Sequence, residues 1–176
     1  MFDDILAFCR QSNNKKAVEI GAGTGKATSP FLDKGLDVTA IDISENMSAF
    51  LKKRFSGNEK FNVITSTFED VKLSNDSYDL IYAASAFHWV DAEIGCPKAF
   101  DLLKKDGVIA LFRYNIIAKV GDTVFEQMQK AYEKYYYSFY TSNNRPIKKT
   151  KKDLIKPSEI FISFRFEDLK IMVLTR

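Results

Sequence analysis

The sequence predicts a single α/β domain built on a doubly wound, mostly parallel sheet with helices on both faces. Two observations carry this prediction. Short apolar runs alternate with longer amphipathic stretches up to about residue 112, and the last run, 108–112, is apolar throughout, as is usual for strands buried on both faces. No Gly-, Pro- or Ser-rich linker divides the 176 residues, which fit one domain.

Five short apolar runs are the expected strands. The first leads directly into glycines, and the second carries an acidic residue, Asp42, at its end next to Ile43. In order along the chain, they span residues 17–20, 38–43, 61–65, 78–84 and 108–112. Strands that alternate with helices at this spacing predict parallel pairing with right-handed crossovers.

Four amphipathic stretches are the expected helices, since their apolar residues recur at helical spacing. Gly35 is a stop signal after the second helix, and Ser44 is an N-cap for the third. The Asp106-Gly107 pair is expected to close the fourth. In order, the helices span residues 3–11, 26–34, 44–55 and 92–104.

The segment after the fifth strand has a different pattern. Residues 121–140 predict a helix with a wide aromatic face, which could cover the sheet or partly roof a ligand pocket, because tyrosine joins an apolar ring to a polar tip. The stretch 158–174 fits either a helix and a strand or two strands. We favour a helix near 158–163 and a strand at 169–174.

Composition excludes several classes of protein. The 26 basic and 23 acidic residues leave a net charge of +3, too weak to indicate a nucleic-acid partner. Residues 145–156 hold six bases and one acid, which indicates a solvated basic loop or an anion-contacting patch. No apolar run could span a membrane, and the N-terminus carries acids where a signal peptide needs bases.

The chain has two cysteines, Cys9 and Cys96, which are too few for a disulfide framework and lack metal-ligand spacing. We therefore expect a cytoplasmic protein with reduced thiols and no metal.

The glycines after the first strand, Gly21, Gly23 and Gly25, allow a tight turn and a close approach to a ligand. A phosphate-binding P-loop needs G-x-x-x-x-G-K-[ST], but Ile20 stands at the first glycine and Ala27 at the hydroxyl position. A dinucleotide loop, G-x-G-x-x-G, would need a third glycine where Lys26 stands. A nucleoside without phosphates, S-adenosylmethionine, remains as the third ligand class.

Two acids support an adenosine-containing ligand. Glu19 precedes the glycines inside a buried strand, where an unpaired carboxylate costs several kcal/mol, and it could help to hold an ammonium group. Asp42 ends the second strand about 20 residues beyond the loop, where a carboxylate can bind both ribose hydroxyls. Asp42 could instead be a capping or loop acid, and the pair alone leaves nicotinamide dinucleotides open.

Five segments, in order, resemble class I S-adenosylmethionine-dependent methyltransferases, especially those acting on small molecules. The resemblance covers roughly residues 15–115, and 121–176 would form a substrate-side extension with the last strand. It implies a Rossmann-like fold, S-adenosyl-L-methionine as cofactor, S-adenosyl-L-homocysteine as product and a small-molecule methyl acceptor. The segments are VEIGAGTG (18–25), AIDISENM (40–47), STFEDV (66–71), YDLIYAASAFHWVD (78–91) and LKKDGVIAL (103–111).

The resemblance also implies roles for individual residues around the cofactor. The methionine portion would lie against the first loop, the ribose on Asp42, and the adenine against residues after the second and third strands. The implied contacts are Glu19, Gly21, Ala22, Gly23 and Gly25 for the methionine portion, Asp42 for the ribose, Ile43, Met47, Thr67, Phe68 and Glu69 for the adenine, and Ala84 beside the sulfonium.

His88 is the only histidine, and it precedes the only tryptophan, Trp89, just after the fourth strand. These two residues could shape the pocket wall, or His88 could orient or deprotonate the acceptor. Because positioning alone can supply about 7–11 kcal/mol, a dedicated base is not obligatory.

Compared with the family it resembles, the chain looks short at both ends, with an incomplete C-terminal β-hairpin. We expect a more open cofactor cleft with weaker affinity, and an unpaired edge at the fifth or sixth strand that favours a homodimer. The alternatives are a non-catalytic or truncated S-adenosylmethionine-binding module and an NAD-dependent oxidoreductase.

Overall fold

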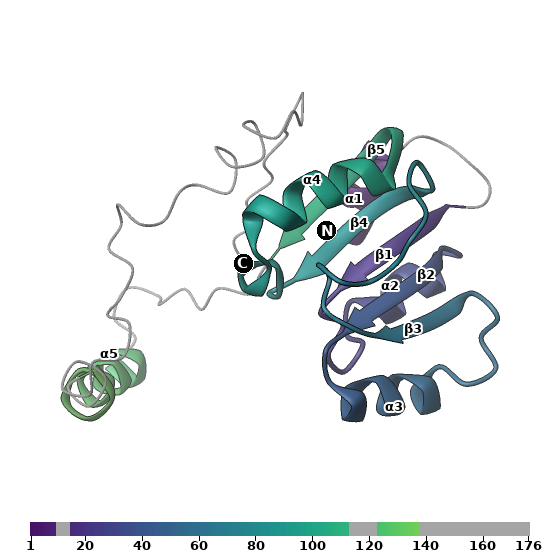
Figure 1. The fold of residues 1–176 in the computed structure, drawn as a ribbon. Helices are drawn as coiled ribbons and strands as arrows, with labels where there is room; N and C mark the ends of the chain where they lie inside the picture. Colours follow the sequence, from purple (N-terminus) through teal and green to yellow (C-terminus); the bar gives the residue numbers. More distant parts are fainter. Residues whose placement is uncertain (10–14, 113–122, 138–176) are drawn as a thin grey trace.

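The computed structural model describes residues 1–9, 15–112 and 123–137 (Figure 1). Its centre is a five-stranded sheet in the order β3-β2-β1-β4-β5, and each neighbouring pair is parallel. This confirms the predicted fold class. The strands are β1 (Lys16–Ile20), β2 (Asp37–Asp42), β3 (Phe61–Thr65), β4 (Tyr78–Ala84) and β5 (Leu103–Phe112).

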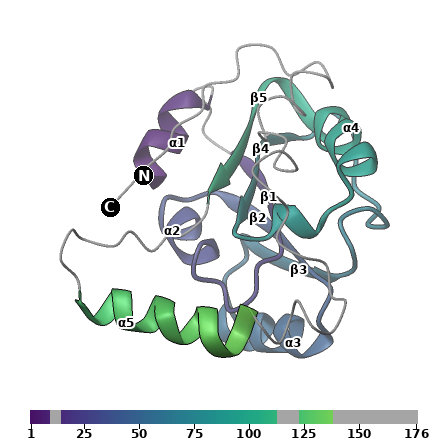
Figure 2. The ribbon, with the colours of Figure 1, turned by 90° about the vertical axis from the view of Figure 1, so that its left-hand side faces the viewer.

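Helices cover both faces of the sheet. Figure 2 shows α1 and α2 on one side and α4 on the other, while α3 packs through Leu51 against Ala40 of β2 and Val63 of β3. The helices are α1 (Phe2–Phe8), α2 (Thr28–Asp33), α3 (Glu45–Arg54) and α4 (Ala92–Leu102), with a short 3-10 helix, η1 (Phe87–Trp89), before α4.

Side chains of β1 alternate between the two faces, as strand geometry requires. Ala17 packs with α1 and α2, and Val18 and Ile20 pack in the core beneath α4. By the same alternation Glu19 points toward α2. This placement of an acid inside the core determines its chemistry, described below.

The boundary between α4 and β5 differs from the prediction. The helix is expected to reach residue 104 but ends at Leu102, and the strand expected to begin at residue 108 already begins at Leu103. The pairing is irregular there, because Leu103 pairs with Tyr78 while Val108 pairs with Leu80. The extra residues of β5 therefore form a bulge, in which Asp106 has a positive φ of 63°.

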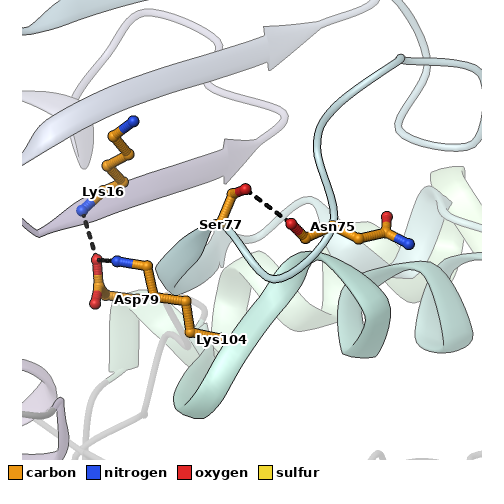
Figure 3. Close-up of polar contacts among 5 residues, drawn as sticks. All are labelled: Lys16, Asn75, Ser77, Asp79 and Lys104. Carbon is orange, nitrogen blue, oxygen red and sulfur yellow. Dashed lines mark hydrogen bonds and ion pairs between the residues drawn. The ribbon is translucent and has the colours of Figure 1, made fainter.

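An ion pair holds this bulge against the sheet. Asp79 is nearly buried, and its Oδ2 accepts hydrogen bonds from the Lys104 ammonium (2.8 Å) and from the backbone N–H of Lys16 (2.9 Å) (Figure 3). One carboxylate therefore joins β1, β4 and β5 at their amino-terminal ends. Nearby, the Ser77 hydroxyl donates to the Asn75 carbonyl at 2.8 Å.

The expected aromatic helix is described in part, as α5 (Thr123–Ala131) followed by a π-helical turn (Tyr132–Tyr137). Among its described side chains Val124, Met128, Tyr132 and Tyr135 are exposed, so they show neither of the two expected roles. The basic segment 145–156, the helix near 158–163 and the strand at 169–174 lie outside the described residues.

Candidate functional site

The glycine loop, defined as residues 21–25, follows β1. This strand lies at the point where the order of the strands in the sheet reverses. β2 and β3 extend the sheet on one side of β1, while β4 and β5 lie on the other. In open α/β sheets, ligands bind outside the carboxyl ends of the strands at such a switch point. The predicted site residues that follow β1, β2, β3 and β4 all belong to this edge.

Three glycines in the loop have positive φ angles, of 67° at Gly21, 53° at Gly23 and 75° at Gly25. A Cβ at Gly21 would lie 2.4 Å from the Cβ of Ala86, and one at Gly25 would lie 2.8 Å from Leu51. Protein atoms therefore fill those two directions. A Cβ at Gly23 would meet nothing within 4 Å, so this is the position where a ligand can approach the backbone.

Asp42 joins the loop to β2 and α3. Its Oδ2 accepts the N–H of Gly23 at 2.7 Å, and its Oδ1 accepts the N–H of Ser44 at 2.9 Å. Ser44 in turn caps α3, since its hydroxyl accepts the N–H of Met47 at 3.3 Å. Each carboxylate oxygen has a second lone pair, so Asp42 can hold the loop and still accept ligand hydroxyls.

Glu19 lies beneath the loop and is only 1% exposed. Its Oε2 accepts hydrogen bonds from the Thr28 hydroxyl and from the Tyr82 hydroxyl (3.0 Å). Burial raises the pKa of Glu19 to about 7, the two hydroxyls lower this pKa, and the charge of Asp42 raises it. The carboxyl group therefore joins β1 to α2 and β4 inside the core.

Sequence reasoning missed Thr28 and Tyr82 as partners of Glu19. A signal was available for Tyr82, because pairing the two central strands in parallel sets it beside Glu19 in the register. The hydroxyl of Thr28 reaches Glu19 only through the packing of α2 on the sheet, which local sequence patterns do not specify.

Apolar surface lies next to Asp42. Ile43 is 73% exposed, which is unusual for a large aliphatic residue directly after a buried strand. Met47, one helical turn further on, is half-buried. Together they offer the apolar contact expected of an adenine-binding surface.

The turn after β3, defined as residues 66–71, uses its predicted site side chains for internal contacts. The Thr67 hydroxyl donates to Asp70 Oδ2 (2.7 Å) and accepts the N–H of Asp70 (3.1 Å). The side chain of Phe68 is 3% exposed and packs in the core. Glu69 Oε1 accepts the N–H of Asp91 (2.8 Å). Side-chain recognition of a ligand by Phe68 is therefore excluded, and the turn offers its backbone.

At the end of β4, Ala84 is half-buried, and the next residue, Ser85, has a positive φ of 58°. The N–H of Ser85 donates to the carbonyl of Phe112 at 2.8 Å. A left-handed non-glycine residue is uncommon and often marks a functional site. The sequence carried no signal for it.

The predicted catalytic residue, His88, lies in η1 after β4 and is exposed. Its ring centroid lies 4.9 Å from that of Trp89, and the indole is 83% exposed. The two rings thus stand on the surface beside the carboxyl edge of the sheet.

Within the described ranges, no helix is long and apolar enough to cross a membrane. The same residues contain no group of three or more His, Cys, Asp or Glu that could hold a metal ion. Cys9 and Cys96 are buried free thiols, and burial raises the pKa of each to about 11.

A parallel sheet in this order, with a glycine loop after β1 and an acid at the end of β2, defines the Rossmann-like class of nucleotide-binding domains. A family model described as a methyltransferase domain matches residues 18–111. The chain belongs to the class I S-adenosylmethionine-dependent methyltransferase family, as the five resembling segments predicted.

Individual relatives agree with this assignment. An uncharacterised methyltransferase of Mycobacterium tuberculosis is 31% identical over 97 residues, which cover 55% of this chain and 39% of that protein. A candidate S-adenosyl-L-methionine-dependent methyltransferase of Methanococcus maripaludis has a similar fold, with a TM-score of 0.67 at 17% identity, covering 98% of this chain and 77% of the other.

A second solved structure shares the fold. Phosphoethanolamine N-methyltransferase 1 of Haemonchus contortus, solved with phosphoethanolamine and S-adenosylhomocysteine, has a TM-score of 0.53 at 23% identity, covering 61% of this chain and 24% of that one. The chain thus spans well under half the length of the Mycobacterium relative and of this enzyme.

Proposed function

We propose that this chain binds S-adenosyl-L-methionine at the carboxyl edge of the sheet and transfers its methyl group to a small-molecule acceptor, with S-adenosyl-L-homocysteine as product. The observation that carries the proposal is the open side of Gly23, whose N–H is held by the carboxylate of Asp42. The loop comes closest to a ligand there, with the acid that would hold the ribose directly beside it.

The residues present fit this cofactor. Gly21, Ala22, Gly23 and Gly25 would form the loop beneath the methionine portion. Glu19, at the end of β1 just before this loop, is the acid proposed for the ammonium group of that portion, and its carboxyl group is also held by Thr28 and Tyr82. The other groups that would hold the cofactor are Asp42 for the ribose, Ile43 and Met47 for one face of the adenine, the backbone of Thr67, Phe68 and Glu69 for its edge, and Ala84 beside the sulfonium.

When bound, the cofactor supplies a methyl group on a positively charged sulfur, which an acceptor can take by direct displacement. The chain contributes position: a nucleoside fixed at the glycine loop presents one face to the acceptor, and this arrangement lowers the entropic part of the barrier. His88 and Trp89, exposed beside that edge, would orient the acceptor, and His88 could accept its proton.

A turnover assay separates an enzyme from a non-catalytic binding module. The full chain is incubated with methyl-labelled cofactor and a panel of carboxylate, hydroxyl, amine and carbon acceptors. Labelled product from at least one acceptor, reduced in His88→Ala, supports the enzyme. Binding of S-adenosylhomocysteine without transfer to any acceptor would support the module instead. In a separate binding measurement, binding of NAD with no binding of S-adenosylhomocysteine would favour the oxidoreductase.

The proposal also covers the location and the partners of the protein. A small-molecule acceptor, the net charge of +3 and the two free buried thiols are consistent with a cytoplasmic enzyme that does not act on nucleic acid or at a membrane. A homodimer formed through a free sheet edge belongs to the same proposal.

A further inference from the structure

Lys98 lies in α4, and its side chain connects this helix to the turn after β3. Its ammonium donates hydrogen bonds to the carbonyl of Glu69 at 2.8 Å and to the carbonyl of Val71 at 2.6 Å. The turn, residues 66–71, contains no helix or strand of its own. These two hydrogen bonds therefore fix a segment whose backbone would otherwise be held by local contacts.

Two further contacts join the same turn to α4. Glu69 Oε1 accepts the N–H of Asp91, the N-cap of α4, at 2.8 Å. The ring of Phe68 packs in the core beneath α4, and the ammonium of Lys98 stands 5.6 Å from its centroid. Asp91 follows the exposed Trp89 by two residues. The turn is therefore connected both to the middle of α4 and to the segment that carries His88.

The ammonium of Lys98 occupies this place against an electrostatic cost. Burial lowers the pKa of Lys98, and the charge of Lys72 lowers this pKa further, while Asp70 and Glu69 partly compensate. Hydrogen bonds from a charged donor are stronger than neutral ones. Two such bonds to consecutive parts of one turn are suited to fixing its backbone.

We propose that Lys98 is a positioning residue for the base of the cofactor. By holding the carbonyls of Glu69 and Val71, it fixes the turn in the conformation in which the backbone of Phe68 and Glu69 can distinguish adenine from other purines. The inference rests on the proposed binding of S-adenosylmethionine and adds the residue that determines base selectivity. Because the side chains of Thr67, Phe68 and Glu69 are engaged elsewhere, the fixed backbone is what can read the base.

The test compares two ligands that differ only at the base. Calorimetry on the full chain measures the dissociation constants of S-adenosylhomocysteine and of S-inosylhomocysteine, in which an oxygen replaces the 6-amino group. The wild type should prefer the adenosyl ligand by about tenfold, the contribution of one hydrogen bond. In Lys98→Met this ratio should fall toward one, and Lys98→Arg, which can still donate to two carbonyls, should retain most of it.

Two controls separate positioning from folding. Lys105→Met removes a lysine that is exposed in β5, and Asp79→Ala destabilises the far end of the sheet by removing the contacts to Lys16 and Lys104. Both should keep the tenfold ratio, even if Asp79→Ala melts at a lower temperature. If Lys98→Met does not fold, Lys98→Gln, whose shorter and uncharged amide makes weaker hydrogen bonds to the carbonyls, provides the same comparison with a smaller loss.

The outcomes distinguish this inference from the function on which it rests. If the wild type binds neither ligand, the proposed function is wrong, and the role of Lys98 is wrong with it. If the wild type binds both ligands equally, or Lys98→Met keeps the tenfold ratio, the positioning role alone is overturned.

Discussion

The carboxylate of Asp42 has two backbone partners, the N–H of Gly23 in the glycine loop and the N–H of Ser44 at the start of α3. It therefore determines how the loop stands relative to β2 even before a ligand is present. A residue with this geometry should affect ligand affinity in two ways, through its own contact with the ribose and through the shape of the loop.

We expect Asp42→Ala to weaken the binding of S-adenosylhomocysteine at least tenfold, because hydrogen bonds to a charged group contribute about 1.5–3 kcal/mol. Titration calorimetry measures the change. Asp37→Ala is the matched control, since Asp37 is an exposed acid at the other end of the same strand. Equal affinities for the Asp42 variant and the wild type would exclude a ligand contact by Asp42.

Glu19 predicts a dependence of stability on pH. Burial raises its pKa to about 7 in the folded protein, from an ordinary value of 4.5. The folded state therefore binds the proton more tightly than the unfolded chain does. The contribution of Glu19 to stability is fully present below pH 4.5 and is lost as the pH rises to about 7.

The variant Glu19→Gln removes this titration and can still accept hydrogen bonds from Thr28 and Tyr82. Relative to this variant, the wild type should lose up to ~3 kcal/mol of unfolding free energy between pH 4.5 and pH 8. Urea unfolding at several pH values measures the difference. Glu59→Gln, at an exposed acid, should show no such trend, and a pH-independent difference for Glu19→Gln would contradict the prediction.

The glycine loop contains two kinds of glycine. Gly21 faces Ala86, while Gly23 faces open space, although both have positive φ angles. Alanine at a left-handed position costs roughly 1–2 kcal/mol from backbone strain alone. Gly21→Ala adds a steric clash with Ala86, so it should lower the unfolding free energy more than Gly23→Ala does.

Gly23→Ala should instead act mainly on the ligand, since its new methyl group would occupy the side from which the ligand approaches. Gly57→Ala provides the control, because Gly57 also has a positive φ and an open Cβ direction but lies outside the loop. Urea unfolding should give similar losses for these two variants, whereas calorimetry should show weaker S-adenosylhomocysteine binding only for Gly23→Ala. Equal binding would show that the ligand does not approach the loop at Gly23.

Most of the elements could be predicted from local sequence patterns. The four earlier strands lie within one residue of their predicted bounds, since each apolar run ends at a strong local signal such as the glycines after Ile20. The α4–β5 boundary could not be predicted, because the pair Asp79–Lys104 joins residues distant in the sequence and holds the bulge to the sheet.

Part of the candidate site could also be predicted from local sequence patterns. The sequence predicted the loop and Asp42, because glycines and an acid at strand ends have few other uses together. It did not predict that the ring of Phe68 enters the core or that Glu69 accepts the N–H of Asp91. Both facts depend on where α4 packs, and that packing involves residues more than 20 positions away.

On the scale of the whole sheet, as far as residues 1–9, 15–112 and 123–137 describe it, β5 is less covered than its sequence suggests. Its apolar residues 108–112 are half-buried, although the run predicted burial on both faces. In the described part of the chain, β3 and β5 form the two edges of the sheet, and each pairs with one neighbour. An apolar strand at the edge of a sheet favours pairing with another chain.

We therefore expect the chain to dimerise as its concentration rises. Size-exclusion chromatography with light scattering should give a mass that moves from that of one 20.1 kDa chain toward twice that value. A strict monomer at high concentration would contradict pairing through the edge.

The most direct test of the proposed ligand is titration calorimetry of the full chain with S-adenosylhomocysteine, NAD and ATP in parallel. We predict that S-adenosylhomocysteine binds at one site per chain and that Asp42→Ala greatly weakens this binding. NAD and ATP should give no saturable heat. Saturable binding of NAD with no response to S-adenosylhomocysteine would contradict the assignment of this site to S-adenosylmethionine.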